Sequence, residues 1–397
     1  MGKSALVAFV AAALVVAPQA QAVEAAPSAG TWLAGQFVNG DHLLKGPDLV
    51  DEGLTADGVY ALAAAGVGKS TAQKAAAWLA ASPQLETFIG DGEAESYVGG
   101  LAKLALVAQT LGQDPHRFGG VDLLGRLSAL QGEDGRFRDK TDPSFDMTNA
   151  FTQSLAIITL KRAGQPVDAP VKFAASTQCQ GAGFPIVFGE ATCQSDVDAT
   201  AMVLQALLAA GEKTVSAKAL DWLVAQQQPD GGFPAASAGS NANTTGLAVG
   251  ALVAGGRAEA ADKAVAYLRT LQVGCAGPEA QRGAIAYDSK GFEPYPAIRA
   301  TTQAMLGLAR VGLADVSASS STAGVPAIDC APPASTPPSS SAPAPAGPAP
   351  AAPAAPADPP LAATGPDQAV PLTLFGSFAV LAGAVLVFVS RRRKVGA

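Results

Sequence analysis

Hydrophobic and small residues recur through most of the chain at spacings of three and four residues, which is the period of an α-helix. No stretch sustains the two-residue alternation that is typical of a half-buried strand. Six Ala- and Leu-rich segments end at a glycine that suits a left-handed helix cap: Gly66, Gly112, Gly164, Gly211, Gly255 and Gly312. The pattern predicts an all-α domain.

A second set of helices is marked by a residue pair, usually an aromatic residue followed by Leu or Ala, that recurs every 45 to 49 residues. The pairs begin at Trp32, Trp78, Arg126, Phe173, Trp222 and Tyr267. In several repeats a glutamine stands four residues after the pair and a glycine turn follows it: Gln131, Gln178, Gln227 and Gln272. Each repeat therefore predicts a helix, a turn and a second helix.

Six helical hairpins predict a closed ring of six inner and six outer helices, an α/α toroid (α6/α6 barrel), over residues 26–316. We expect the aromatic pairs to lie on the outer helices. An open solenoid is the alternative. It would need a polar capping repeat at each end, and the sequence shows none.

The two ends of the chain predict export and surface attachment. Residues 1–22 have an early Lys, an apolar run and a small-x-small site, as a secretory signal peptide does. Residues 317–360 are rich in Pro, Ala and Ser and predict a disordered linker. Within 361–397, the sequence LAATG precedes an apolar transmembrane segment at 370–389 and a basic tail.

This C-terminal arrangement resembles a Gram-positive LPxTG-like sorting signal, in an LAxTG variant. The resemblance implies that a sortase cleaves between Thr364 and Gly365 and joins Thr364 to cell-wall peptidoglycan. A plain C-terminal membrane anchor is the alternative. Both interpretations place the protein at the extracellular surface.

Composition narrows the chemistry. The net charge is -7 and no basic stripe is present, which argues against nucleic-acid binding. The two histidines are far apart and no Cys/His cluster has metal-ligand spacing, so we expect neither a metal nor another cofactor. Four cysteines in an exported chain predict disulfides. Of the three possible pairings we favour Cys179–Cys193 and Cys275–Cys330.

One repeat, KALDWLVAQQQPDGGF at 218–233, resembles the QW repeat of squalene–hopene and oxidosqualene cyclases. The resemblance implies the α/α toroid of the terpenoid cyclase and protein prenyltransferase superfamily, which also includes complement thioester domains and cobalamin carriers. Because that fold hosts enzymes and binding proteins alike, it does not specify the function.

The stretch Asp196 to Ala201, DVDATA, resembles the D-x-D-D-T-A motif of the cyclases except at Ala199. The resemblance implies that Asp198 is the proton donor and Asp196 a supporting carboxylate. However, the core is poor in the aromatic residues that stabilise carbocations. A full cyclase of this resemblance also closes its cavity between two helical barrels, and this chain has one.

The repeats offer a second interpretation of the same carboxylates. The next repeat places Asn241 and Asn243 on Asp196 and Asp198, and Thr245 on Thr200; Thr55 and Thr301 occupy the same place in two other repeats. Asp and Asn both cap helices, whereas Asn cannot act as a strong acid. The alignment therefore favours helix caps, with or without contact to a ligand.

The starts of the inner helices should converge on one mouth of the ring. The polar residues expected there are Asp146, Asn149, Asp196, Asp198, Asn241, Asn243, Tyr295 and Arg299. A polar rim on an apolar ring predicts a ligand site. The leading hypothesis is a surface-anchored toroid that binds a ligand or partner without chemistry. A squalene–hopene-like terpene cyclase using Asp198 and a structural or adhesive wall protein are the alternatives.

Overall fold

A computed structural model describes residues 18–236, 238–328 and 330 of the 397-residue chain. The predicted transmembrane segment and the Thr364–Gly365 cleavage site lie outside these residues, as does most of the predicted leader. Helix α1 (Pro18–Ala34) begins within the last residues of that leader. No helix in the described part of the chain is long and apolar enough to cross a membrane.

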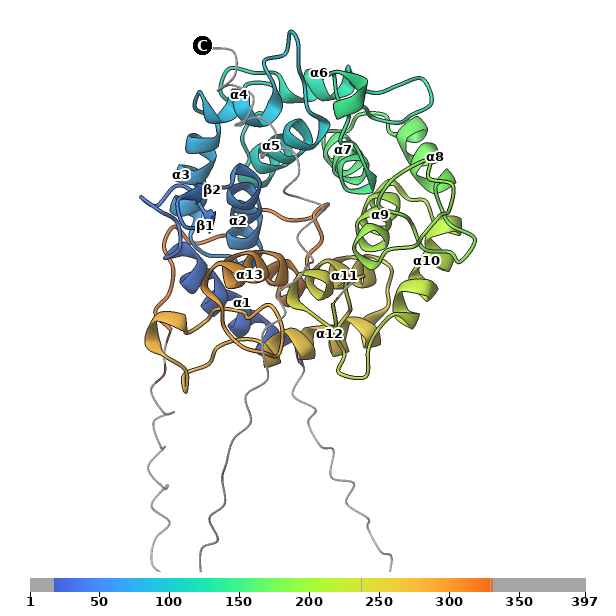
Figure 1. Ribbon diagram of the computed structural model, residues 1–397. Helices are drawn as coiled ribbons and strands as arrows, with labels where there is room; N and C mark the ends of the chain where they lie inside the picture. Colours follow the sequence, from blue (N-terminus) through green and yellow to red (C-terminus); the bar gives the residue numbers. More distant parts are fainter. Residues whose placement is uncertain (1–17, 237, 329, 331–397) are drawn as a thin grey trace, which may run out of the picture. The chain divides into compact units, whose positions relative to one another are not determined.

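Six helices form a closed inner ring (Figure 1). They are α2 (Glu52–Ala65), α5 (Val98–Leu111), α7 (Ala150–Arg162), α9 (Val197–Ala210), α11 (Ala242–Ala254) and α13 (Pro294–Leu308). Each packs against the next in chain order, and α13 packs against α2, which closes the circle. Closure leaves no exposed end, so a ring of six repeats needs no capping repeat.

The outer helices alternate with the inner ones along the chain. They are α1, α3 (Lys69–Leu79), α6 (Leu123–Ser128), α8 (Asp168–Ser176), α10 (Thr214–Ala225) and α12 (Ala258–Thr270). All six residue pairs of the sequence repeat lie on these helices, as predicted. The remaining elements are short: α4 (Gln84–Ile89), the 3-10 helices η1 (Pro143–Phe145) and η2 (Glu279–Gln281), and an antiparallel pair, β1 (Leu44–Gly46) and β2 (Leu49–Val50).

A repeated side chain fixes the turn that enters five of the six inner helices, a threonine in four of them and Gln153 in α7. The Thr200 hydroxyl accepts a hydrogen bond from the Phe184 backbone N–H at 2.8 Å, and Thr245 accepts one from Phe233 at 2.9 Å. Thr55 and Thr301 do the same for Leu43 and Ile285, while Gln153 does so for Phe137. These partners are buried side chains of the core. The threonine alignment made from the sequence is therefore confirmed.

The repeated glutamine joins consecutive repeats. The Gln227 amide donates to the Gly231 carbonyl of its own turn and to the Ala260 carbonyl of the next outer helix, both at 2.9 Å. Gln178 makes the corresponding bonds one repeat earlier. Gln272 reaches the Ala25 carbonyl of α1 at 2.8 Å, so the last repeat is joined to the first by the same contact.

Four of the six predicted glycine caps have the expected left-handed backbone: Gly66, Gly112, Gly164 and Gly211. The other two predictions are wrong. At the end of α11 the positive φ is at Gly256 rather than Gly255, and α13 ends at Leu308 with the positive φ at Arg310. Helix α11 does end just before Gly255, its cap, but the next glycine takes the left-handed turn, whereas α13 stops before Gly312 because Arg310 takes it.

Residues 309–328, which we call the strap, cross the end of the ring where the inner helices terminate. The Gln205 amide oxygen on α9 accepts from Leu313 N–H at 3.1 Å, and the Arg162 guanidinium on α7 donates to the Leu313 and Val316 carbonyls. Ala318 N–H then bonds to the Thr110 carbonyl of α5 at 2.9 Å. The compact unit thus ends at residue 328 and includes residues that the composition assigned to the linker.

Two disulfides stabilise the described chain. Cys179 and Cys193 are bonded across the loop before α9, with Cα atoms 5.5 Å apart. Cys275 and Cys330 are disulfide-bonded as well, and none of the four cysteines is free. Both bonds agree with the predicted pairing.

Candidate ligand-binding site at the mouth of the ring

The inner helices run in the same direction, because each repeat enters its inner helix from an outer one, so their first turns gather at one mouth. The threonine alignment defines six equivalent positions there: Gly53, Gly99, Phe151, Asp198, Asn243 and Arg299. All six are partly exposed, although they lie in helices whose other positions are largely buried. We call these six residues the mouth layer.

The residues that cap the inner helices stand two positions before the mouth layer. Asp196 accepts a hydrogen bond from Ala199 N–H at 2.9 Å, and Asn241 accepts one from Thr244 N–H at 3.0 Å. Asn149 caps α7 in the same way, with a capping box. The predicted caps Asp196 and Asn241 are thus confirmed, and Asn149, which was expected only as a rim residue, is a cap as well.

Asp198 and Asn243 are not caps, contrary to the capping interpretation of the whole motif. Each is the second residue of its helix. The residue two positions earlier, Asp196 or Asn241, already accepts the hydrogen bond from the exposed backbone N–H. The backbone N–H groups at the start of each helix therefore need neither the Asp198 nor the Asn243 side chain.

Asp198 lies in a poorly hydrated environment. Its pKa is raised to about 7, mainly by burial and also by the neighbouring Asp196 carboxylate, while the Thr244 hydroxyl on α11, which is directed to the carboxyl, opposes both effects. The pKa of Asp196 is also raised by burial, while the backbone N–H groups of Ala199 and Asp198 lower it. At neutral pH the Asp198 carboxyl is therefore present in both its protonated and its charged form.

Three buried oxygen atoms at this place make no hydrogen bond within the part of the chain that the structure describes. They are Oδ1 of Asp198, Oδ1 of Asn243 and Oγ1 of Thr244. Buried polar atoms are nearly always paired in folded proteins, so such a group calls for an explanation. Tyr287 lies next to them: burial raises the pKa of its phenol, and Asp198 raises it further.

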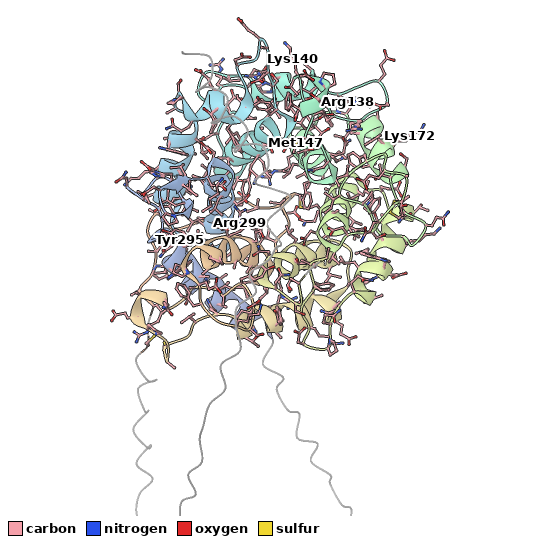
Figure 2. The ribbon with its side chains drawn as sticks, in the orientation of Figure 1. Arg138, Lys140, Met147, Lys172, Tyr295 and Arg299 are labelled. Carbon is pink, nitrogen blue, oxygen red and sulfur yellow. A yellow bond between two sulfur atoms is a disulfide. The ribbon has the colours of Figure 1, made fainter. Side chains whose placement is uncertain are left out.

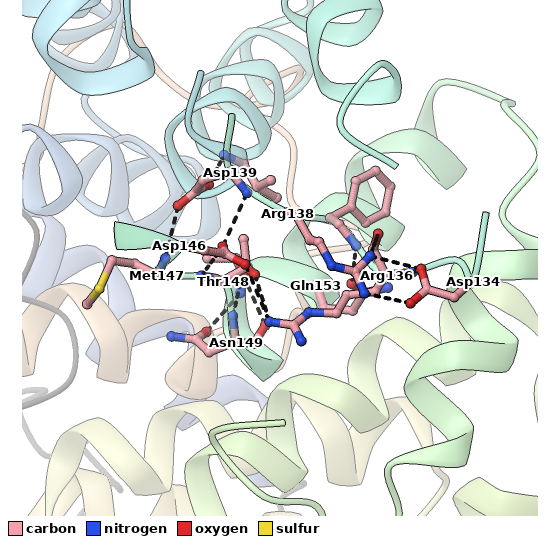
Figure 3. Close-up of polar contacts among 12 residues, drawn as sticks. Asp134, Arg136, Arg138, Asp139, Asp146, Met147, Thr148, Asn149 and Gln153 are labelled. Atoms are coloured by element: carbon pink, nitrogen blue, oxygen red, sulfur yellow. Dashed lines mark hydrogen bonds and ion pairs between the residues drawn. The ribbon is translucent and has the colours of Figure 1, made fainter. Parts of the chain in front are cut away.

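Asp146 belongs to a loop network at the start of α5 and α7 (Figure 3). Its Oδ1 accepts from Asp139 N–H at 3.2 Å, and its Oδ2 lies 3.5 Å from the Arg136 guanidinium. Asp139 in turn accepts from Val98 N–H at 2.8 Å and from Met147 N–H at 3.2 Å. Asp139 thereby supplies the cap that α5 lacks in its own sequence, and Asp146 holds this loop in place.

The α13 side of the mouth is also internally paired. Arg299 bonds to Oδ2 of Asp51 at 3.1 Å, and Asp51 caps α2 through its other oxygen. Tyr295 lies one turn before Arg299 and packs against the core (Figure 2). Met147 lies between the starts of α5 and α7 and is 53% exposed. Asp198 and Asn243 therefore differ from the other predicted rim residues in having unused acceptors.

Two surface pockets are lined by other parts of the chain than the mouth layer. One, of about 350 Å³, is lined by residues that include Gln131, Gln165 and Pro170, and the other, of about 330 Å³, includes Cys193 and Val187. Neither contains a residue of the mouth layer. Across the described ranges, no group of three or more His, Cys, Asp or Glu residues is placed to hold a metal ion.

Comparison with solved structures finds toroids of this kind. A type II terpene cyclase from Scytonema matches with a TM-score of 0.53 at 14% identity, over 73% of this chain and 97% of that chain. A protein from Actinoplanes matches with a TM-score of 0.52 at 16% identity, over 74% of this chain and 99% of that chain. A protein described as a novel α-amylase from Clostridium perfringens matches at 0.53 and 13%, over 72% of this chain and 97% of that chain.

The chain has the α/α-toroid fold of the type II terpene cyclases. At these identities the likeness shows the fold alone, and the matches include a protein of different described activity. No protein-family model and no curated protein sequence matches the chain. The comparison does correct one expectation: the Scytonema cyclase is covered almost entirely by this toroid, so a cyclase of this class does not need two barrels.

Four residues of the site were not identified from the sequence. Asp51 could have been found, since it stands four residues before Thr55 as Asp196 does before Thr200. Thr244 lay within the aligned stretch but had no assigned role. Nothing in the sequence around Asp139 or Tyr287 indicated a role at the site, because each interacts with a helix of another repeat.

Proposed function

We propose that the protein is a secreted, surface-anchored toroid that binds a small ligand at its mouth through Asp198 and Asn243. One observation carries the proposal: two consecutive repeats present a buried side-chain oxygen without a partner at the same position. Leaving such an atom unpaired costs about 1–3 kcal/mol of stability. Helix capping does not account for these two oxygens, because Asp196 and Asn241 already cap the helices. A bound ligand that donates hydrogen bonds offsets that cost.

The test is native mass spectrometry of the full chain purified from a secreting Gram-positive host. We expect a small molecule that stays bound to the wild type and is lost from the double variant Asp198→Ala/Asn243→Ala. Asp221→Ala, on the exposed face of the outer helix α10, is the matched control and should retain it. Circular dichroism checks that each variant remains helical. Equal retention by the double variant, or no bound molecule in any sample, would refute binding at this site.

A second candidate is a terpene cyclase that uses Asp198 as its acid. The raised pKa favours it, because a carboxyl that stays protonated near neutral pH can donate a proton. The match to a Scytonema enzyme whose substrate is geranylgeranyl dihydroxybenzoate supplies a test compound. The full chain should be incubated with this compound and with squalene. The binding proposal expects no cyclised product, whereas products that disappear in Asp198→Asn would establish the cyclase instead.

Surface attachment is part of the same proposal. The two disulfides fit an extracellular environment. The LAATG sequence, apolar run and basic tail support covalent attachment through Thr364. Extraction of the uncleaved chain by detergent alone would replace this with a membrane anchor.

A further inference from the structure

The unused acceptors at the mouth have a common chemical character. Asp198 Oδ1 and Asn243 Oδ1 are both hydrogen-bond acceptors, and one of them belongs to a carboxylate, while the Thr244 hydroxyl beside them is directed to Asp198. They come from the first turns of two helices that pack side by side, α9 and α11. An ammonium group has three donors, no acceptor and a positive charge, which is the complement of this set.

The residues one turn further along each helix are apolar. Met202 follows Asp198 by four residues on α9, and Leu247 follows Asn243 by four residues on α11, so each lies on the same helical face as the acceptor before it. Leu247 is partly exposed, whereas Met202 is buried, so Leu247 presents the apolar surface. A ligand with an alkyl group beside its amine would therefore find apolar surface next to the acceptors.

The charged groups around Asp198 favour a cation. On its own helix the neighbour is Asp196, and on the loop before α13 the groups are Tyr287, Asp288 and Lys290, with Lys290 paired to Asp288. Helix α11 carries no charged residue. The charged residues of the other helices packed on α9 are Lys161, Arg162, Asp168, Lys172, Lys218 and Asp221. None of those six is among the groups that shift the Asp198 pKa.

From this placement we propose that the Asp198–Asn243 site binds a primary ammonium group attached to an alkyl chain. The inference rests on the proposed function and names the ligand class of that same site. The ammonium nitrogen donates to Asp198 Oδ1 and Asn243 Oδ1. Arg299, the one cation of the mouth layer besides the ligand, is engaged by Asp51.

Binding should depend on pH through the carboxyl. With a pKa of about 7, roughly one-tenth of Asp198 is charged at pH 6 and roughly nine-tenths at pH 8. An alkylamine stays protonated over this range, because its pKa is near that of lysine. Its affinity should therefore rise about tenfold from pH 6 to pH 8. A neutral ligand that accepts from the protonated carboxyl would show the opposite trend.

The experiment is isothermal titration calorimetry of the full chain with n-hexylamine at pH 6 and pH 8. Two matched probes separate charge from donors: hexyltrimethylammonium has the charge but no N–H group, and 1-hexanol has neither the charge nor three donors. We expect hexylamine to bind more tightly than both, with the tenfold pH effect. Asp198→Asn should abolish the pH effect, Asn243→Asp should strengthen binding at pH 8, and Asp221→Asn should change nothing.

Equal affinity for hexyltrimethylammonium, or pH-independent binding of 1-hexanol as tight as that of the amine, would overturn the ammonium assignment. So would the absence of hexylamine binding at both pH values. These failures are distinguishable from failure of the proposed function, which is decided by whether the copurified ligand is lost from the Asp198→Ala/Asn243→Ala variant.

Discussion

Replacing Asp198 by Asn tests the environment of the mouth without changing the shape of the side chain. The folded protein holds the Asp198 proton up to a pKa of about 7, whereas in the unfolded chain an aspartate loses its proton near pH 4. The folded state therefore binds more protons than the unfolded state between these values. Over that interval the wild type loses stability as the pH rises.

The magnitude follows from the shift. Each pKa unit corresponds to about 1.4 kcal/mol, so a shift of about three units makes the charged form cost about 4 kcal/mol of folding free energy above pH 8. Near pH 5 the cost is under about 2 kcal/mol, and below pH 4 it is small. Asp198→Asn removes this term, so its stability relative to the wild type should increase through the same interval.

Urea unfolding followed by circular dichroism at pH 4, 5, 6, 7 and 8 measures the difference. We expect the Asn variant to gain on the wild type by about 4 kcal/mol between pH 4 and pH 8, while Asp221→Asn gains nothing. A pH-independent contribution added to this gain is compatible with the reasoning, because Asn makes its own contacts. A difference that stays flat over the whole range would refute the desolvation of Asp198.

Three further outcomes are expected. Asp196→Ala should destabilise the protein by about 1 kcal/mol in thermal melts through loss of the cap, while Asp196→Asn should be nearly silent; equal effects of the two would contradict the capping role. Gln205→Leu should leave a buried strap N–H unpaired and speed amide hydrogen exchange in residues 309–328, and unchanged exchange there would show that this contact does not hold the strap. Replacing Cys179 and Cys193 by Ser should cost up to about 3 kcal/mol in denaturant unfolding, and free thiols found in the native secreted protein would remove the basis for this prediction.

Much of the fold could be predicted from local sequence. Helical periodicity and the recurring aromatic pairs are local features of one repeat. The threonine shared by four inner helices also acts within its repeat, over separations of about twelve to sixteen residues. The caps Asp196 and Asn241 act over three residues. Interactions of such short range leave a repeating trace in the sequence, and six repeats of one length are enough to predict a ring.

The candidate site depended on contacts between repeats. The sequence placed Asp198 in the mouth but could not tell a cap from a buried carboxyl, because its burial comes from α11 and from the loop that carries Tyr287. In the same way, the composition of residues 317–328 suggested a linker, and only packing across the ends of four inner helices makes them part of the strap. The sequence alone thus determined the helices of the two rings, their order and most of their caps. The tertiary structure decided which polar atoms lose water without gaining a partner, since desolvation is set by neighbours that are distant along the chain.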